Sequence, residues 1–143
     1  MSDPAPDTLH ATCVAWDGRA VAITGASGAG KSALGLALLA LGCTLIADDH
    51  VQLTAQDGHL IAHCPQTIVG LIEARGVGII NAHHEMQAQV VLVVDLDRIE
   101  AERLPKERIF TALGCDVPLI YKVDAPHFAP AILQILKAGW SDR

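Results

Sequence analysis

Aromatic and basic side chains are scarce in this sequence. Only 3% of the residues are Phe, Trp or Tyr, and ten Lys and Arg stand against sixteen Asp and Glu, for a net charge of -6. Nucleic-acid binding relies on basic residues that neutralise phosphates and on aromatic rings that stack on bases. The composition therefore argues against a general DNA or RNA binder, and any phosphate is expected to be bound locally.

The sequence also lacks a long hydrophobic run, a signal peptide and a close cysteine pair. The longest uncharged stretch, residues 33–47, is shorter than the roughly 20 residues that a membrane span needs. Residues 1–7 carry no positive charge ahead of an apolar run. The four cysteines stand far apart along the chain: Cys13, Cys43, Cys64 and Cys115. We expect a cytoplasmic protein without a membrane segment, whose cysteines are buried free thiols.

Length and composition predict one folded domain over residues 1–143, preceded only by a flexible segment at 1–7. The apolar fraction is 51% and the charged fraction 18%, which is typical of a globular chain and not of a disordered one. A chain of 143 residues is long enough to bury a single core. No linker or internal repeat suggests a second domain.

The pattern of apolar residues predicts an α/β fold, a mixed sheet with flanking helices and β-hairpins. Asp17-Gly18 and Asp57-Gly58 are turn dipeptides between apolar runs, and they predict two hairpins. Strands are expected over 8–16, 20–24, 43–47, 89–96 and 117–123, and helices over about ten residues from Ser32 and over 129–138. A helical turn is expected at 67–71, an irregular loop at 73–78 and a charged surface connection at 98–108.

The motif Gly25-Ala26-Ser27-Gly28-Ala29-Gly30-Lys31-Ser32 satisfies the whole phosphate-binding P-loop pattern. It stands between a predicted strand and a predicted helix, as the mechanism requires. Glycines let successive backbone N–H groups face an anion, Lys31 neutralises the terminal phosphates, and the Ser32 hydroxyl coordinates magnesium. We therefore expect residues 25–32 to bind a nucleotide with Mg²⁺.

Asp48-Asp49 follows this motif by about one helix and one strand. Ligand sites in open α/β sheets lie at the carboxyl ends of strands, so the pair should lie beside the glycine loop. Side chains alternate along a strand, and we expect only one aspartate to face the nucleotide unless the strand ends or twists there. Phosphoryl transfer needs carboxylates both to hold the metal and to accept a proton.

Glu73 and Arg75, flanked by Gly76 and Gly78, would place a possible metal ligand and a cation on one loop. Spacing alone leaves this segment open between a functional loop and an ordinary surface loop. Two histidine groups are discounted: His59 and His63 are too far apart on a strand to share one ion. His83-His84-Glu85 is interpreted as a solvated polar loop.

Three blocks together resemble the catalytic domain of HPr kinase/phosphorylase. They are residues 24–32, the run Leu45-Ile46-Ala47-Asp48-Asp49-His50-Val51, and the run Glu73-Ala74-Arg75-Gly76-Val77-Gly78-Ile79-Ile80. The resemblance covers about residues 8–124. It implies a fold like that of phosphoenolpyruvate carboxykinase. It also implies an enzyme that phosphorylates a serine of the phosphocarrier HPr with ATP or pyrophosphate, and removes that phosphate with inorganic phosphate.

The resemblance implies a role for individual residues. Asp49 would accept the serine proton in one direction and donate it in the other, with His10 beside it as a catalytic residue. Lys31 and Arg75 would neutralise the transferring phosphate. Ser32 and Glu73 would hold magnesium, and Asp48 would support the metal through water. Residues 72–81 would serve both reactions.

Three departures from the family pattern qualify this expectation. We expect a short form without the family's N-terminal domain. The family's C-terminal Gly-Arg-Asn motif has no arginine here, where residues 123–127 stand, so Arg75, Arg108 or a neighbouring subunit would have to supply the cation. The end at Arg143 removes most of the C-terminal helical region that the family ties to dephosphorylation and to hexamer contacts. We therefore expect kinase activity in a homo-oligomer, ahead of phosphorylase activity and hexamer formation. A small-metabolite kinase and a non-catalytic nucleotide sensor remain the alternative functions.

Overall fold

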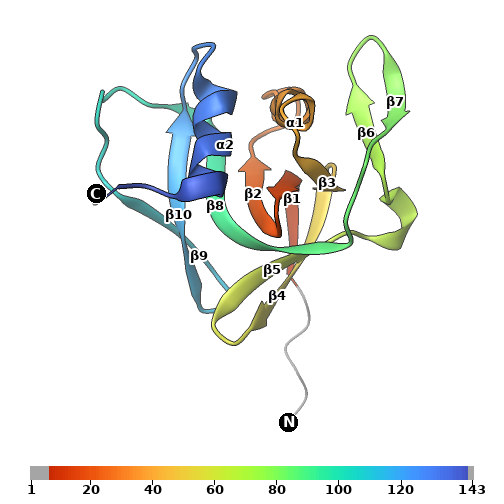
Figure 1. Cartoon of the computed structure of the whole chain (residues 1–143), viewed down its shortest axis with the longest axis horizontal. Helices are drawn as coiled ribbons and strands as arrows, with labels where there is room; N and C mark the ends of the chain where they lie inside the picture. Colours follow the sequence, from red (N-terminus) through yellow and green to blue (C-terminus); the bar gives the residue numbers. More distant parts are fainter. Residues whose placement is uncertain (1–6, 142–143) are drawn as a thin grey trace.

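The computed structural model describes residues 7–141 and consists mainly of strands, with two α-helices (Figure 1). In chain order the elements are β1 (Asp7–Trp16), β2 (Arg19–Thr24), α1 (Lys31–Ala40), β3 (Thr44–Ala47), β4 (His50–Gln56), β5 (His59–His63), the 3₁₀ turn η1 (Gln66–Ile68), β6 (Leu71–Ala74), β7 (Gly78–Asn81), β8 (Gln87–Ile99), β9 (Arg108–Ala112), β10 (Cys115–Lys122) and α2 (Phe128–Ala138). The predicted mixed α/β class is confirmed. The expected flexibility of residues 1–7 concerns residues outside the described range, except for Asp7, which begins β1.

An eight-stranded sheet forms the body of the molecule, in the order β2-β1-β4-β5-β8-β10-β9 with β3 paired to β1. The predicted hairpins β1–β2 and β4–β5 form. In the first, Asp17 and Gly18 adopt φ of 50° and 77°, the left-handed pair that a two-residue hairpin turn requires. The long strand β8 pairs with β5 and also in parallel with β2, so β1, β2, β8, β5 and β4 close into a ring of hydrogen-bonded strands.

Both faces of this sheet are buried near β1 and β2, because alternate residues enter two different apolar clusters. Cys13 and Ala15 belong to the cluster inside the curled sheet, whereas Val14 between them belongs to the cluster under the helices. A strand covered on both sides reads as a continuous apolar run, which is why residues 20–24 show little alternation in sequence. All four cysteines are buried free thiols, as predicted.

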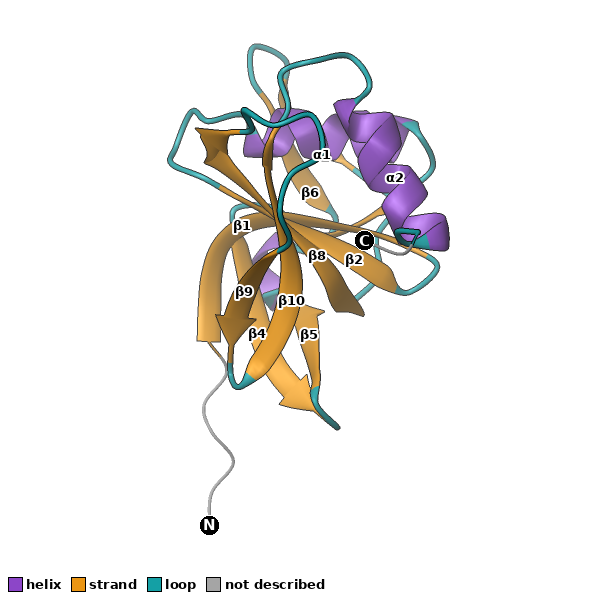
Figure 2. Cartoon of the chain, turned by 90° about the vertical axis from the view of Figure 1, so that its left-hand side faces the viewer, coloured by secondary structure: helices purple, strands orange, loops and turns teal. Residues whose placement is uncertain are grey.

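The two helices cover the apolar cluster that includes Val14, at one end of the sheet (Figure 2). Leu38 of α1 and Ile132 and Leu136 of α2 are fully buried there. Gly42 follows α1 with φ of 109°, and its N–H donates to Leu39 O, which ends the helix where the sequence predicts. No helix within residues 7–141 is long and apolar enough to cross a membrane.

The prediction of an irregular loop at 73–78 was wrong. These residues belong to a separate two-stranded hairpin, β6–β7, in which Ile72 and Ala74 are buried while Leu71 and Glu73 are exposed. Gly76 alone provides the tight turn, with φ of 84°, and Val77 N donates to Ala74 O. The alternation of buried and exposed residues is the strand signal that the two nearby glycines obscured.

Two further segments differ from the sequence-based expectation. The charged connection at 98–108 is shorter, because β8 continues to Ile99 and β9 begins at Arg108. Strand β9 was not predicted at all, and it pairs with β10 through a turn at Leu113-Gly114 with φ of 51° and 75°. The helical turn expected at 67–71 occupies only Gln66–Ile68, because Leu71 begins β6.

Candidate functional site

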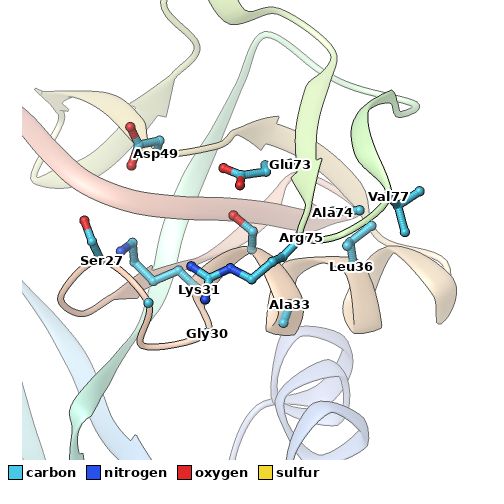
Figure 3. A pocket seen from close by; sticks show the side chains of 12 residues that line it. Ser27, Gly30, Lys31, Ala33, Leu36, Asp49, Glu73, Ala74, Arg75 and Val77 are labelled. Carbon is cyan, nitrogen blue, oxygen red and sulfur yellow. The ribbon is translucent and has the colours of Figure 1, made fainter.

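A hollow of about 480 Å³ lies between the glycine loop, the first turns of α1 and the hairpin β6–β7 (Figure 3). Around it gather the carboxylates of Asp49 and Glu73 and the cationic side chains of Lys31 and Arg75. These residues come from three separate stretches of the chain, and the fold brings them together. The strand β2 delivers the loop, and β3 ends immediately before the two aspartates.

The loop between β2 and α1 follows a backbone path that depends on glycine. Gly25, Gly28 and Gly30 take φ of 153°, 85° and 103°, values that L side chains rarely adopt. A Cβ on Gly25 would also lie 3.0 Å from Cβ of Ala29. Helix α1 begins directly after Gly30 with no side-chain cap, so its first N–H groups open toward the hollow.

Lys31 is buried, with only 8% of its surface exposed. Its Nζ donates to the carbonyls of Gly25 at 2.9 Å and Ala26 at 3.1 Å. The long side chain therefore turns back over the loop instead of reaching into solvent. This arrangement holds the Lys31 ammonium against the backbone of the glycine loop.

Asp97 contacts the loop from the end of β8, and sequence reasoning missed it. The N–H of Ala26 donates to both carboxylate oxygens of Asp97, at 2.9 and 3.1 Å. Strand β8 runs parallel to β2, so its carboxyl end lies beside the loop. The signal was present in the sequence, because Asp95 and Asp97 follow the apolar run at 90–94 as acidic residues near the end of a strand.

Asp48 is a buried carboxylate that accepts three hydrogen bonds. Its Oδ1 accepts from the hydroxyls of Ser32 and Thr12, each at 2.7 Å, and its Oδ2 accepts from the N–H of Glu73 at 2.9 Å. Thr12 lies on β1 with no exposed surface, and the sequence analysis did not identify it. Asp48 thereby connects the start of α1, the strand β1 and the hairpin β6–β7.

Asp49 faces the other way and lines the hollow. It adopts φ of 75°, a left-handed conformation between β3 and β4 that turns its side chain away from that of Asp48. His10 Nε2 lies 2.5 Å from its Oδ1, and His50 Nε2 lies 3.3 Å from its Oδ2. The carboxylate therefore has an imidazole at each oxygen, and His50 is a second histidine that sequence reasoning did not single out.

Glu73 and Arg75 reach the hollow from the hairpin β6–β7. Arg75 crosses toward the glycine loop, because its Nη2 lies 4.0 Å from where a Cβ on Gly28 would be. Arg108, the alternative cation considered from the sequence, lies elsewhere. Its guanidinium bonds Glu100 at 2.5 Å and stacks over the ring of Tyr121, and this bond lowers the pKa of the Glu100 carboxyl.

The remaining ionisable residues do not form a separate metal centre in the described part of the chain. Among residues 7–141, no three His, Cys, Asp or Glu side chains are arranged to hold an ion by themselves. His63 Nε2 bonds the Thr54 hydroxyl at 2.7 Å, and His59 Nδ1 bonds Gln89. Burial lowers the pKa of His63 below its ordinary value. Any cation at the hollow would therefore draw on hydroxyl, carboxylate and substrate oxygens together.

Comparisons with known proteins show which family the chain is similar to. The family model described as "HPr Serine kinase C-terminal domain" matches residues 5–121. An HPr kinase/phosphorylase of Clostridium botulinum is 45% identical over 78 residues, covering 54% of this chain and 26% of that protein. The HPr kinase/phosphorylase of Bordetella pertussis is 37% identical over 114 residues, covering 71% of this chain and 37% of that protein. The chain thus spans well under half the length of these relatives.

A solved structure shares the fold as well as the sequence. The Hpr(Ser) kinase/phosphatase from Coxiella burnetii superposes with a TM-score of 0.74 and 30% identity, covering 92% of this chain and 88% of that one.

Proposed function

The chain belongs to the family of HPr serine kinase C-terminal domains, and from that premise we propose that it transfers the γ-phosphoryl group of ATP to a serine of an HPr-like phosphocarrier. The same site would run the reverse phosphorolysis, in which inorganic phosphate attacks the phosphoserine and pyrophosphate is released. The observation that supports the proposal is that the two adjacent aspartates point in different directions. Asp48 is tied to Ser32, while Asp49 faces the hollow beside Lys31.

Residues 25–32 would hold the phosphates of ATP through backbone N–H groups and the ammonium of Lys31. Magnesium, when bound, neutralises phosphate charge and orients the γ-phosphoryl group. The Ser32 hydroxyl and Glu73 would hold it. Both oxygens of Asp48 already accept hydrogen bonds, which fits a supporting role through water better than direct ligation.

Asp49 would accept the proton of the attacking serine. As the serine oxygen bonds to the γ-phosphorus, the bond to the ADP oxygen breaks and the hydroxyl proton passes to the Asp49 carboxylate. His10 bonds Asp49 Oδ1 and would orient the carboxylate toward the acceptor. In the reverse direction the protonated Asp49 would return the proton to the serine.

Arg75 would compensate the charge that develops on the transferring group. The charged residues around the hollow are two cations, Lys31 and Arg75, and two acids, Asp49 and Glu73. Because Arg75 already reaches over Gly28, it can take the place of the C-terminal arginine that the family pattern would supply.

Mass spectrometry of an HPr-like protein after incubation with this chain and Mg-ATP tests the proposal. One added phosphate on a serine is expected, and Lys31→Ala and Asp49→Asn should abolish it. A matched control is Asp57→Asn, which replaces an exposed aspartate of the same left-handed backbone, φ 53°, in the turn between β4 and β5. Retained ATP binding without any transfer would contradict the kinase and favour a nucleotide sensor. Transfer to a small metabolite would favour the other alternative.

A further inference from the structure

A straight row of uncharged hydrogen-bonding side chains crosses four strands of the sheet. Thr8 of β1 pairs with Gln52 of β4, Gln52 pairs with His63 of β5, and His63 pairs with Gln87 of β8. Residues directly opposite each other in neighbouring strands point to the same face of a sheet. The four side chains therefore form one continuous polar row.

This row lies on the outer face of the sheet. Its neighbours along the strands, Leu9, Val51, Ala62 and Ala88, pack into the cluster inside the curled sheet. Because side chains alternate, the row must point away from that cluster. Thr8, Gln52 and Gln87 are exposed and His63 is half-buried, so the row is open to a partner.

The row ends in a second hollow, of about 620 Å³. Gln52, His63 and Gln87 line one side of it, and residues 64–67 with Met86 line the other. No Asp, Glu, Lys or Arg is among the lining residues. The outward positions of β4 and β5 likewise include no Asp, Glu, Lys or Arg. They are His50, Gln52, Thr54, Gln56, His59, Ile61 and His63.

Strand β4, which contributes Gln52 to the row, begins directly after the candidate catalytic residue Asp49. Asp49 lines the first hollow, His50 follows it as the first residue of β4, and Gln52 lies two positions further on the same face. His10 and His50, the two imidazoles on Asp49, are direct cross-strand partners. One strand thus connects the two hollows.

The side from which the acceptor approaches Asp49 indicates which molecule would contact this surface. The nucleotide phosphates would lie on the glycine loop, so the acceptor hydroxyl must reach Asp49 from the side away from Lys31. A polypeptide that presents a serine there extends over the neighbouring outer face. Glutamine side chains both donate and accept, which matches the N–H and C=O groups of a peptide chain, whereas an anionic ligand would need cations.

We propose that the Thr8–Gln52–His63–Gln87 row and its hollow form the docking surface for the polypeptide that carries the acceptor serine. The surface holds that polypeptide through uncharged hydrogen bonds. This inference rests on the proposed kinase function and names a specificity surface for it outside the phosphate site.

Binding of the unphosphorylated HPr-like protein to immobilised chain tests the proposal, together with initial rates of transfer. The variants are Gln52→Ala, Gln87→Ala and the double variant, with Gln134→Ala on the exposed face of α2 as the matched control. Each lost hydrogen bond should raise Kd by roughly 2- to 10-fold. KM for the carrier should rise in parallel, while KM for ATP and the Gln134→Ala values stay unchanged. Weak dependence of Kd on salt is expected, because no charge pair is involved.

A pair of charged variants, Gln52→Glu and Gln87→Glu, keeps side-chain size and should weaken binding further by desolvating a carboxylate. An unchanged Kd in the double alanine variant, with transfer intact in the parent chain, would overturn the docking surface and leave the kinase standing. A Kd that rises steeply with salt would also overturn it. If the parent chain neither binds nor phosphorylates the carrier, the proposed function fails and the surface fails with it.

Discussion

The hydroxyl of Thr12 donates a 2.7 Å hydrogen bond to Oδ1 of Asp48, the same oxygen that accepts from Ser32. Two residues earlier on β1, His10 contacts Asp49. Residues two apart on a strand share a face, so one face of β1 presents a hydroxyl to one aspartate and an imidazole to the next. Strand β1 therefore positions both carboxylates, although β2 and not β1 leads into the glycine loop.

Thr12→Val should destabilise the fold. Valine matches threonine in shape but leaves the buried carboxylate of Asp48 without one donor, and hydrogen bonds to charged groups contribute about 1.5–3 kcal/mol. Chemical denaturation should show a loss of that size, whereas Thr12→Ser, which keeps the hydroxyl, should lose less. Equal stability of the valine variant and the parent chain would show that Asp48 does not depend on Thr12.

Gly35→Ala should destabilise α1 even though alanine is the better helix former by about 1 kcal/mol. A Cβ at residue 35 would lie 2.7 Å from Cγ2 of Thr12, and overpacking of this kind costs about 1–3 kcal/mol. Thr12→Ser removes that methyl group. The double variant should therefore be more stable than the sum of the two single changes predicts, and strict additivity would refute the contact.

Arg75→Gln should lower kcat more than it changes the affinity for ATP. The guanidinium is expected to stabilise charge that develops only during transfer, and loss of one such donor typically costs about 10²–10³-fold in rate. Arg75→Lys should recover part of the loss. Steady-state rates with the HPr-like acceptor, set beside ATP binding by calorimetry, separate the two effects. Arg108→Gln is the control, because Arg108 pairs with Glu100 away from the hollow.

His63 should make the fold less stable in mild acid. Burial lowers its pKa in the folded state below the ordinary 6.5, so the unfolded chain binds the proton more readily. Neutral His63 therefore costs the fold nothing above pH 6.5, and the free energy of unfolding falls as the pH drops below that value. Unfolding free energies measured between about pH 5 and 8 should fall less steeply in His63→Gln than in the parent chain. Parallel profiles would contradict the assignment.

Cys13 should resist thiol reagents in the folded protein. Burial raises the pKa of its thiol to about 12, and the thiolate is the reactive form. Mass spectrometry after brief alkylation at neutral pH should find Cys13 unmodified in the native chain and modified in denaturant. Rapid native labelling at Cys13 would mean that the sheet opens far more often than its burial indicates.

Local sequence patterns predicted many of the secondary-structure elements of this protein. The turn dipeptides Asp17-Gly18 and Asp57-Gly58 predicted their hairpins, because those positions need left-handed backbone that few residues adopt easily. Helix α1 and its end at Gly42 followed in the same way. Strand β9 did not, because its partly exposed edge residues show little contrast between the two faces, and its Leu113-Gly114 turn lacks the usual Asn or Asp.

The sequence by itself determined the glycine loop, the adjacent aspartates and the set of residues with which the chain can approach a phosphate. Only the tertiary structure decided which partners each of those residues contacts. Asp48 turns to Thr12 and Ser32, and Asp49 turns to His10, because Asp49 itself adopts a left-handed backbone just after β3 has ended. Asp97 reaches the loop only because β8 lies parallel to β2. Contacts between distant segments depend on strand order and register, which no short motif encodes.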